Sequence, residues 1–287
     1  MVTSIIHAYR DDPRLRQSFN QLARDTFGLD FEPWYQNGFW GGQYDPWSLL
    51  LDGEIAANVS VNRINCLLDG QRRQYLQLGT VMTRADLRGR GLNRLVMGAA
   101  LAEREAWDGV FLYANDSVLD YYPRFGFQAA PEYRYRASIT GLASPTVRPV
   151  PMETPADWRH FLAEKSCRQC LGLLQLETDS LLMFYLSQSM RDAVFFIPEA
   201  NAYVLAEQDG ELLTVYDAFA PAPLPLLELC RAFGPSVCRV EFAFTPAGRD
   251  GLEEYEYHAE DTTLFISGSP LAQDWERLRG FPELAHA

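Results

Sequence analysis

The spacing of apolar residues at the start of the chain predicts one amphipathic helix followed by a series of hairpins. In RLRQSFNQLARDTFG, apolar residues recur every three or four positions and fall on or near one helical face; they are Leu15, Phe19, Leu22 and Phe27. Three apolar runs follow between Trp47 and Thr83, separated by Asp52-Gly53 and Asp69-Gly70. Asp-Gly pairs between apolar runs are a strong hairpin signal, so these runs predict consecutive antiparallel strands.

A second helix is predicted directly after the sequence RGRG. Its apolar residues have the i, i+3, i+4 spacing of a buried stripe; they are Leu92, Leu95, Val96, Ala99 and Ala100. GVFLYAN then reads as a short buried strand. DSVLDYYPRFGF predicts a helix that stops near Pro123, followed by another strand.

The second half of the chain repeats this order. Residues 141–153 are rich in proline and lose periodicity, which predicts a linker. Thr154, Pro155 and Asp157 form the start signal of a helix, with a capping-box pair around a first-turn proline. A hairpin at Asp209-Gly210, the helix LPLLELCRAFG and the strands VCRVEFAF and DTTLFISG follow. We therefore expect a tandem of two related α/β domains, residues 1–140 and 154–287.

Composition is that of a soluble globular protein. Hydrophobic residues make up 47% and charged residues 22% of the 287 positions, and no apolar run reaches the length of a membrane span. The first residues lack the basic head and apolar stretch of a signal peptide. The expected location is the cytoplasm.

Negative charge is concentrated in the second half. Residues 1–145 hold 15 Arg against 16 Asp and Glu, whereas residues 146–287 hold 10 basic against 22 acidic residues, within a total of −13. This balance argues against nucleic acid as a partner, because phosphate binding needs a basic face. The acidic half is either a solvated surface or an electrostatic lure for a cationic substrate.

The five cysteines do not form a recognisable framework. Cys167 and Cys170 make a CxxC, which could be redox-active or half of a zinc site. They stand in EKSCRQCLGLL, which reads as a helix, with no second CxxC and only His160 nearby. We expect free thiols and no metal.

The turn RGRGLN points to a phosphate ligand. A strand that feeds a glycine-bearing turn into a helix presents unpaired N–H groups and the positive end of the helix dipole, which together suit a pyrophosphate. Gly89 and Gly91 remove the Cβ atoms that would block close approach, and arginines add positive charge. The turn is neither a Walker loop nor a dinucleotide fingerprint.

Arg88-Gly89-Arg90-Gly91-Leu92-Asn93 resembles the [Q/R]xxGx[G/A] pyrophosphate loop of the GNAT superfamily of acetyltransferases. LGTVMT is similar to the family's splayed fourth strand, and ANDSVLDYYPRFGF to its N-x(6)-Y-x(3)-GF segment. The likeness covers about residues 1–137. It implies a mixed α/β fold, with a mostly antiparallel sheet flanked by helices, and acetyl-CoA as co-substrate. Asn93 departs from the family's Gly or Ala, so its side chain must point away from the phosphates.

The resemblance also implies roles for particular residues. Tyr122 becomes the general acid that protonates the CoA sulfur, while Tyr121 beside it is expected to pack inward. The N–H near Met82 would polarise the thioester carbonyl, and Asn115 would orient the pantetheine. The implied cofactor-binding set is Val81, Met82, Thr83, Arg88, Gly89, Arg90, Gly91, Leu92, Asn93, Arg94 and Asn115.

The general base and the acceptor remain open. QYLQLGTVMT offers only Gln74 and Gln77, and Asp45, Glu32 or a water chain could serve as the base. The acceptor is expected to be a small cationic or aminoacyl amine, because aromatic residues can bind cations. The loop that could line its site contains Trp34, Tyr35, Phe39, Trp40, Tyr44 and Trp47; each could equally be core.

The second half lacks an equivalent phosphate turn. Pro221, Pro223 and Pro225 stand where RGRGLN would recur, and proline has no backbone N–H to offer. Residues 154–287 are therefore predicted to be a degenerate GNAT-like domain that shapes the acceptor pocket or forms a homodimer surface. The leading function is acetyl transfer to an amine; a non-catalytic acetyl-CoA sensor is the alternative.

Overall fold

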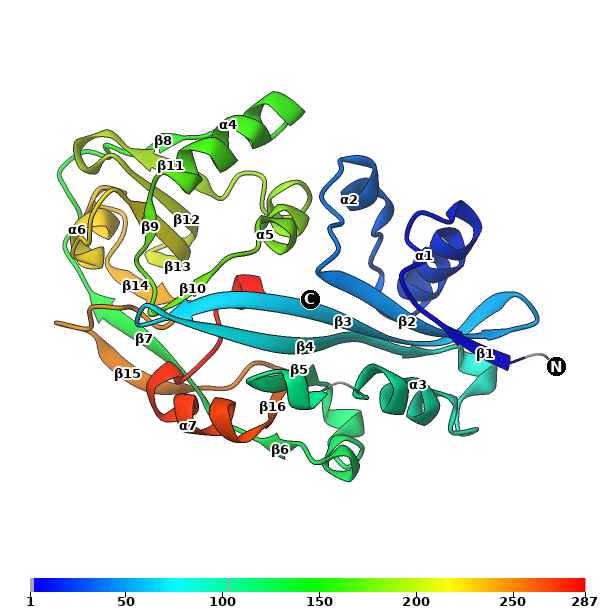
Figure 1. The fold of residues 1–287 in the computed structure, drawn as a ribbon. Helices are drawn as coiled ribbons and strands as arrows, with labels where there is room; N and C mark the ends of the chain where they lie inside the picture. Colours follow the sequence, from blue (N-terminus) through cyan, green and yellow to red (C-terminus); the bar gives the residue numbers. More distant parts are fainter. Residues whose placement is uncertain (1–2, 103, 287) are drawn as a thin grey trace.

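Two mixed β-sheets organise the computed structural model, which describes residues 3–102 and 104–286 (Figure 1). The first sheet contains β1 (Thr3–Ile6), β2 (Tyr44–Leu51), β3 (Glu54–Leu68), β4 (Gln71–Thr83), β5 (Gly109–Ala114), β6 (Gln128–Ala129), β10 (Leu174–Leu176) and β16 (Thr263–Ser267). The second contains β7 (Glu132–Ser138), β8 (Arg148–Pro149), β9 (Gln169–Cys170), β11 (Val194–Ile197), β12 (Ala202–Asp209), β13 (Leu212–Ala220), β14 (Arg239–Phe242) and β15 (Glu253–Tyr257). The predicted mixed α/β class is confirmed.

Seven α-helices pack on these sheets in the described part of the chain. They are α1 (Pro13–Phe27), α2 (Glu32–Gln36), α3 (Leu92–Ala100), α4 (Pro155–Ser166), α5 (Asp179–Leu186), α6 (Leu226–Arg231) and α7 (Ser269–Leu278). The capping box predicted for α4 is present, since Thr154 and Asp157 bond reciprocally. The helix predicted before Pro123 is wrong: the segment forms two 3-10 turns, η3 (Asp116–Val118) and η4 (Tyr122–Phe125), ended by Gly126 in the left-handed conformation.

The predicted hairpins are confirmed. β3 pairs antiparallel with β2 and β4, and both connecting Asp-Gly pairs have positive φ at each residue. That conformation is the type I′ turn, whose twist matches that of the flanking strands.

Both sheets contain the same strand arrangement. The hairpin β3–β4 is followed by β5, which runs parallel to β4 from the pair Tyr75/Gly109 to Leu78/Leu112. The hairpin β12–β13 is likewise followed by β14, parallel to β13. In each sheet the two parallel strands are paired over only a few residues and then separate. The repeated order seen in the sequence therefore corresponds to two similar halves.

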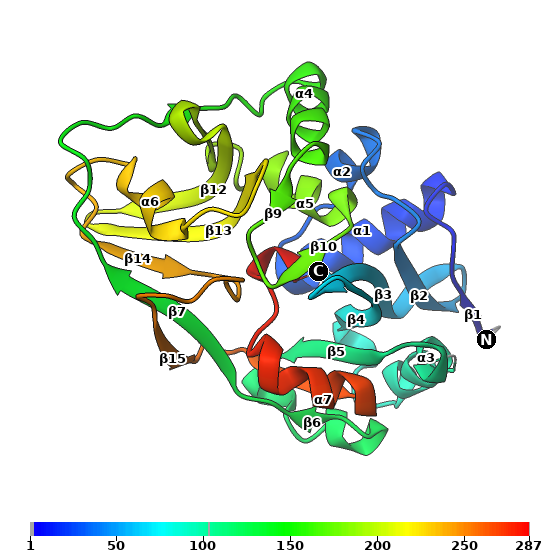
Figure 2. The ribbon, with the colours of Figure 1, turned by 60° about the vertical axis from the view of Figure 1, so that its left-hand side comes forward.

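Strands from the other half of the chain join each sheet: β7 joins the second sheet, and β10 and β16 join the first. β7 leaves the first half and lies between β14 and β15 (Figure 2), while β16 returns from the second half to lie between β5 and β6 (Figure 1). The sheets thus do not follow the division into residues 1–140, 141–153 and 154–287. An amphipathic strand pattern shows that a segment pairs, but it does not show with which strand.

The first sheet is covered on both faces. The α3 face is filled by apolar residues that include Val96, Leu112 and Ala114. Helices α1 and α2 cover one end of the opposite face, and α7 covers the other end around Phe111 and Trp275. Figure 1 shows α1 and α2 above the long β3–β4 ribbon and α3 below it.

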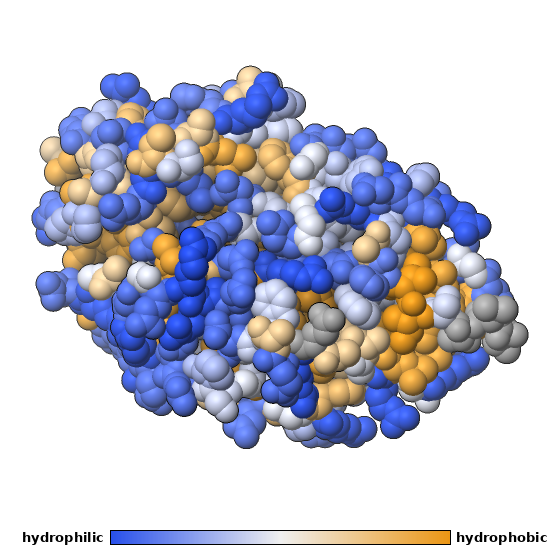
Figure 3. Space-filling model, viewed as in Figure 1, coloured by the Kyte–Doolittle hydropathy of each residue, from blue (hydrophilic) through white to orange (hydrophobic). Residues whose placement is uncertain are grey.

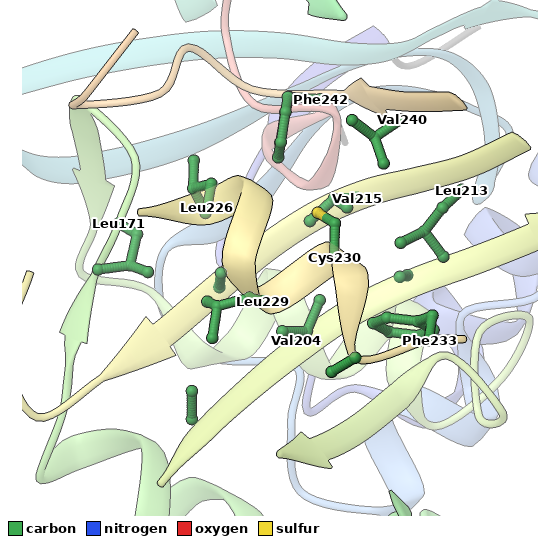
Figure 4. Close-up of a cluster of buried hydrophobic side chains, with 14 of the residues drawn as sticks. Leu171, Val204, Leu213, Val215, Leu226, Leu229, Cys230, Phe233, Val240 and Phe242 are labelled. Atoms are coloured by element: carbon green, nitrogen blue, oxygen red, sulfur yellow. The ribbon is translucent and has the colours of Figure 1, made fainter. Parts of the chain in front are cut away.

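The second sheet has its own core beneath α6. Leu229 and Cys230 of this helix pack on Val204, Val215 and Val240 of the strands (Figure 4). No helix within residues 3–102 and 104–286 has the length and apolar character needed to cross a bilayer.

The helix predicted through the CxxC sequence is wrong. α4 ends at Ser166, Cys167 is its C-cap and Cys170 lies in β9. The chain turns there because the following residues pair as a strand with β13. Among the described residues, no group of three or more His, Cys, Asp or Glu side chains is placed to hold a metal ion.

Candidate active site

A cavity of about 690 Å³ lies where β4 and β5 separate, a place called here the β4/β5 opening. Its walls come from β4, the RGRGLN turn, the loop after β5, the end of α1 and His286 near the end of the chain. The predicted site residues that line it are Val81, Met82, Thr83, Arg88, Gly89, Gly91, Leu92, Asn93, Arg94, Asn115 and Tyr122. Arg90 does not line the cavity, because its guanidinium extends toward the backbone oxygen of Asp86.

A bulge in β4 forms one wall of the cavity. Gly79 pairs with Ser60 and Met82 with Asn58, so Thr80 and Val81 together stand opposite the single residue between them on β3. Thr80 has a φ of 39°, which is unusual for a residue with a β-branched side chain. The buried amide of Asn58 donates to the Thr80 carbonyl at 2.9 Å and holds this strained backbone in place.

The RGRGLN turn has the backbone geometry of an anion cradle. Gly89 and Gly91 have φ of 76° and 74°, and Gly91 is the N-cap of α3. No atom lies within 4 Å of the Cβ that either glycine would carry, so the space next to them is open. The first N–H groups of α3 therefore face a space that a phosphate could enter.

The side chain of Asn93 points away from that space. Its Nδ2 donates to the backbone oxygens of Asn58 and Met82, both at 3.2 Å, and its Oδ1 accepts from the Tyr121 hydroxyl at 2.9 Å. The departure from a small residue at this position is thus explained: the amide fastens the first turn of α3 to β3, to β4 and to the loop after β5.

Tyr121 and Tyr122 both line the cavity but differ in burial and in bonding. The expectation that Tyr121 packs inward is not met: Tyr121 is half-buried, whereas Tyr122 is 4% exposed and packs against Phe127 and Phe265. Burial raises the pKa of Tyr122 above its ordinary value. The Tyr121 hydroxyl is bound to Asn93, while that of Tyr122 makes no hydrogen bond with the described residues.

Asn115 is held by a residue that no local sequence signal could identify. Its Nδ2 donates to the carboxylate of Asp261 at 2.9 Å, and the N–H of Asp116 donates to the same carboxylate at 2.7 Å. Asp261 precedes β16, so the exchanged strand also fixes the loop after β5. The side-chain amide hydrogens of Asn115 are directed at Asp261 rather than at the cavity.

The aromatic loop proposed as an acceptor site is core instead. Trp34, Trp40 and Tyr44 are buried with Phe19 and Phe31 under α1 and α2. Large rings at this density bury more apolar area as a cluster than as pocket walls. Tyr35, Phe39 and Trp47 are also absent from the described lining of the β4/β5 opening.

Two suggested general bases are occupied elsewhere. Asp45 is paired with Arg63 and His7, and Glu32 with Arg16; neither carboxylate lines the cavity. Gln74 bonds to Asn65, so of the polar β4 residues considered only Gln77 lies in the lining.

Several cavity residues escaped sequence reasoning or were given no role, and three of them carry polar groups at the point where the strands separate or at the end of the chain. They are Gln77, Tyr113 and His286. Gln77 and Tyr113 belong to the strands whose separation forms the opening, so their positions beside the motif residues were a possible signal. His286 is far from them in sequence, and only the tertiary fold brings it there.

The corresponding opening between β13 and β14 is filled by the chain itself. The N–H of Leu171 donates to the Ala218 oxygen at 2.8 Å, and the Leu171 oxygen accepts from the N–H of Ala247 at 3.0 Å. Leu173 adds a bond from its N–H to the Thr245 oxygen at 2.8 Å. Figure 4 shows the Leu171 side chain at the edge of the second core, on the same side as Leu226.

The acidic strand β15 does not form a free negative surface at the cavity. Glu253 pairs with Arg136 at 2.8 Å, and Glu254 accepts from Tyr135 and lies near Arg249 and Arg279. Figure 3 shows hydrophilic residues gathered at the lower left of this face, where Figure 1 draws β7, β15 and α7. None of the three glutamates of β15, Glu253, Glu254 and Glu256, lines the β4/β5 opening.

Residues 5–127 match the family model described as the acetyltransferase (GNAT) family. This part of the chain is a GNAT acetyltransferase domain. The separation of β4 from β5 and the glycine turn before α3 agree with the resemblance of LGTVMT and RGRGLN to the family. GNAT acetyltransferases take the acetyl group from acetyl-CoA, so this domain carries the family's acetyl-transfer fold.

Solved structures extend the likeness over both halves. A probable N-acyltransferase from Enterococcus faecalis V583 has a TM-score of 0.60 at 12% identity, covering 96% of this chain and 75% of that one. A GCN5-related N-acetyltransferase from Kribbella flavida has a TM-score of 0.56 at 18% identity, covering 92% and 71%. A GCN5-related N-acetyltransferase from Anabaena variabilis has a TM-score of 0.54 at 12% identity, covering 92% of this chain and 72% of that one. At these identities the likeness establishes the fold. No curated protein matches the sequence.

Proposed function

We propose that this GNAT protein moves an acetyl group from acetyl-CoA directly to an amine, with Tyr122 as the general acid. The observation that carries the proposal is the continuity of one cavity from the Gly89–Gly91 turn, through the β4 bulge, to the Tyr122 ring. A pyrophosphate at one end and a thioester at the other would then lie within a single space.

The cofactor would be held mostly by backbone groups. The first N–H groups of α3 and the turn glycines would bind the pyrophosphate, and Arg88 and Arg94 would add charge at its edge. Val81, Met82 and Thr83 would pair with the pantetheine arm along the separated edge of β4. The Asn115 side chain can offer it only the amide oxygen, because its Nδ2 is bound to Asp261.

Tyr122 suits the acid step by its surroundings. Its raised pKa keeps the phenol protonated at neutral pH, and its hydroxyl is not committed to another described residue. When the carbon–sulfur bond breaks, the phenol would supply the proton that the thiolate needs. Tyr121 is a weaker candidate, because Asn93 already accepts its hydrogen bond.

We propose one acetyl-CoA site per chain, in residues 1–140. The prolines at 221–225 remove N–H groups from the second half, and the segment around Leu171 fills the β13/β14 opening. Residues 154–287 would then act by completing the first sheet with β16 and by closing the acceptor side with His286. The acceptor would be a small cationic or aminoacyl amine.

Two measurements test this function. Titration calorimetry with acetyl-CoA should give one site per chain. Release of CoA should then be followed with a panel of spermidine, tobramycin and leucinamide. Turnover with any of them supports the enzyme, whereas binding without turnover across the panel favours the sensor alternative. A stoichiometry of two would contradict the assignment of the second half.

A further inference from the structure

A second cavity of about 220 Å³ lies beside the first, and His286 lines both. Its walls come from β7, β15, the segment after β14 and the last residues of the chain, including Glu132, Arg134, Tyr257 and Glu283. The exchanged strand β7 therefore builds a polar compartment directly behind the candidate active site.

One hydrogen bond connects the two cavities. Tyr113 lines the first cavity, and its hydroxyl donates at 3.1 Å to Oε1 of Glu132, which lines the second. Tyr113 follows Leu112, the last β5 residue paired with β4, so it stands at the point where the strands part. The amine that attacks the thioester must reach this point.

Tyr113 and Tyr122 approach the cavity from opposite faces of the sheet. Leu112 and Ala114 join the apolar cluster that contains Tyr122, whereas Tyr113 packs with Phe111 in the cluster under α7. Side chains alternate along a strand, so neighbouring residues point to different faces. An acid on one face and a proton acceptor on the other would flank a thioester held between them.

We propose that Tyr113 and Glu132 form the route by which the acceptor amine loses its proton. The proposal rests on the acetyl-transfer function above and supplies the base that the sequence did not reveal. As the carbon–nitrogen bond forms, the nitrogen gives a proton to the Tyr113 oxygen, and the Tyr113 O–H proton passes to Glu132 Oε1. The carbon–sulfur bond breaks, the sulfur takes its proton from Tyr122, and the Tyr122 phenolate regains a proton from water in the first cavity. Glu132 then releases its proton to water in the second cavity.

The surroundings suit this transfer. Burial is the main cause that raises the pKa of Glu132 to about 7, and the nearby charge of Glu283 adds to it. The hydrogen bond from Tyr113 and the charge of Arg134 act in the opposite direction. An acceptor near neutrality can take a proton and return it. Burial, reinforced by Glu132, raises the pKa of Tyr113 well above its ordinary value, so its hydroxyl keeps a proton to pass on.

His286 acts as a positioning residue. Its ring lies 3.7 Å from that of Tyr113, between centroids, and burial together with Arg134 lowers its pKa to about 3. It therefore remains a neutral imidazole that holds Tyr113 without competing for the proton. Charged or titratable groups around the Tyr113–Glu132 pair also come from the other elements packed there. They are Tyr133 and Arg134 on β7, Tyr185 on α5, Glu241 on β14, Tyr257 on β15 and Glu283. Arg134 binds both Glu241 and Glu283.

The pH profile of kcat/KM distinguishes this route from a structural role. With spermidine, or the panel amine turned over fastest, the wild type should show a limb that rises through pH 7 as Glu132 ionises. Glu132→Gln should lose about 10²-fold at pH 7 and recover toward pH 9, where free amine becomes abundant. Tyr113→Phe should lose as much, and the double variant no more than either.

Glu283→Gln is the matched control. It removes another carboxylate of the same cavity that is bonded to Arg134 rather than to Tyr113. Glu283→Gln should keep the maximal kcat/KM. It should move the rising limb of the pH profile to lower pH, because Glu283 raises the pKa of Glu132. The proposal is overturned if Glu132→Gln keeps the rising limb of the kcat/KM profile, or if it lowers kcat/KM equally at every pH.

Carbon-13 NMR of glutamate-labelled protein provides a test without an acceptor. One carboxyl should titrate near pH 7, vanish in Glu132→Gln and titrate higher in Tyr113→Phe. Absence of such a carboxyl overturns the proposal even if acetyl transfer is found. Conversely, a protein with this titration but no turnover of any amine refutes the proposed function and, with it, the catalytic use of the pair.

Discussion

The Tyr121 hydroxyl donates to Oδ1 of Asn93 across 2.9 Å, and this bond joins the loop that carries Tyr122 to the first turn of α3. The Asn93 amide continues the connection to Asn58 and Met82. The phosphate cradle, the bulged strand and the candidate acid are therefore positioned by one side chain.

A double-mutant cycle on this pair should show coupling. Asn93→Ala removes three hydrogen bonds of a partly buried amide and should lower the free energy of unfolding by about 1–3 kcal/mol. Tyr121→Phe should cost about 1 kcal/mol, and the double variant should cost less than the sum. Denaturant melts of the four proteins measure the coupling. Strict additivity would mean that the bond contributes nothing in solution.

Replacing the Tyr122 phenol should affect chemistry rather than binding. Tyr122→Phe keeps the packed ring but removes the proton donor, so turnover should fall ~10²-fold or more while acetyl-CoA affinity stays near wild type. Steady-state kinetics and calorimetry check the two parts. Tyr121→Phe is the control, and it should keep most of the turnover. The opposite result would transfer the acid role to Tyr121.

The left-handed glycine of the cradle should not tolerate a side chain. Gly91→Val places a β-branched residue at φ of 74°, which costs at least ~1–2 kcal/mol, and points a Cβ into the open space beside the turn. Acetyl-CoA binding should be lost. Gly98→Ala is the control: it lies in the same helix with open space around it, and alanine should stabilise α3 by up to ~1 kcal/mol. Retained affinity in Gly91→Val would move the phosphate site elsewhere.

Residues 1–140 should not fold alone, despite containing every cofactor motif. Without β16, five consecutive β5 residues lose their pairing partners on the edge away from β4, and Phe111 loses the cover of α7. The fragment should lack a cooperative thermal transition and should not bind acetyl-CoA. A full chain cleaved between Ala143 and Ser144, in an exposed stretch, should stay together because both exchanged strands remain. A stable, cofactor-binding fragment would show that β16 is dispensable.

Local patterns in the sequence determined much of the first half. The Asp-Gly pairs specify type I′ turns, so the hairpins β2–β3–β4 follow from the twist those turns impose. The glycine turn before an amphipathic stripe likewise specifies the start of α3. These features depend on residues within a few positions of one another, and they sufficed to identify the family and the cofactor motif.

Tertiary structure decided what depends on long-range pairing. β7 and β16 each have an ordinary strand pattern, and only the packing of both sheets decides that they change places. The aromatic loop looked equally suited to a pocket or a core, and burial beneath α1 made it core. Glu132 meets Tyr113, and His286 reaches the cavity, through this exchange, because side chains far apart in sequence become neighbours only when the sheets that carry them are assembled.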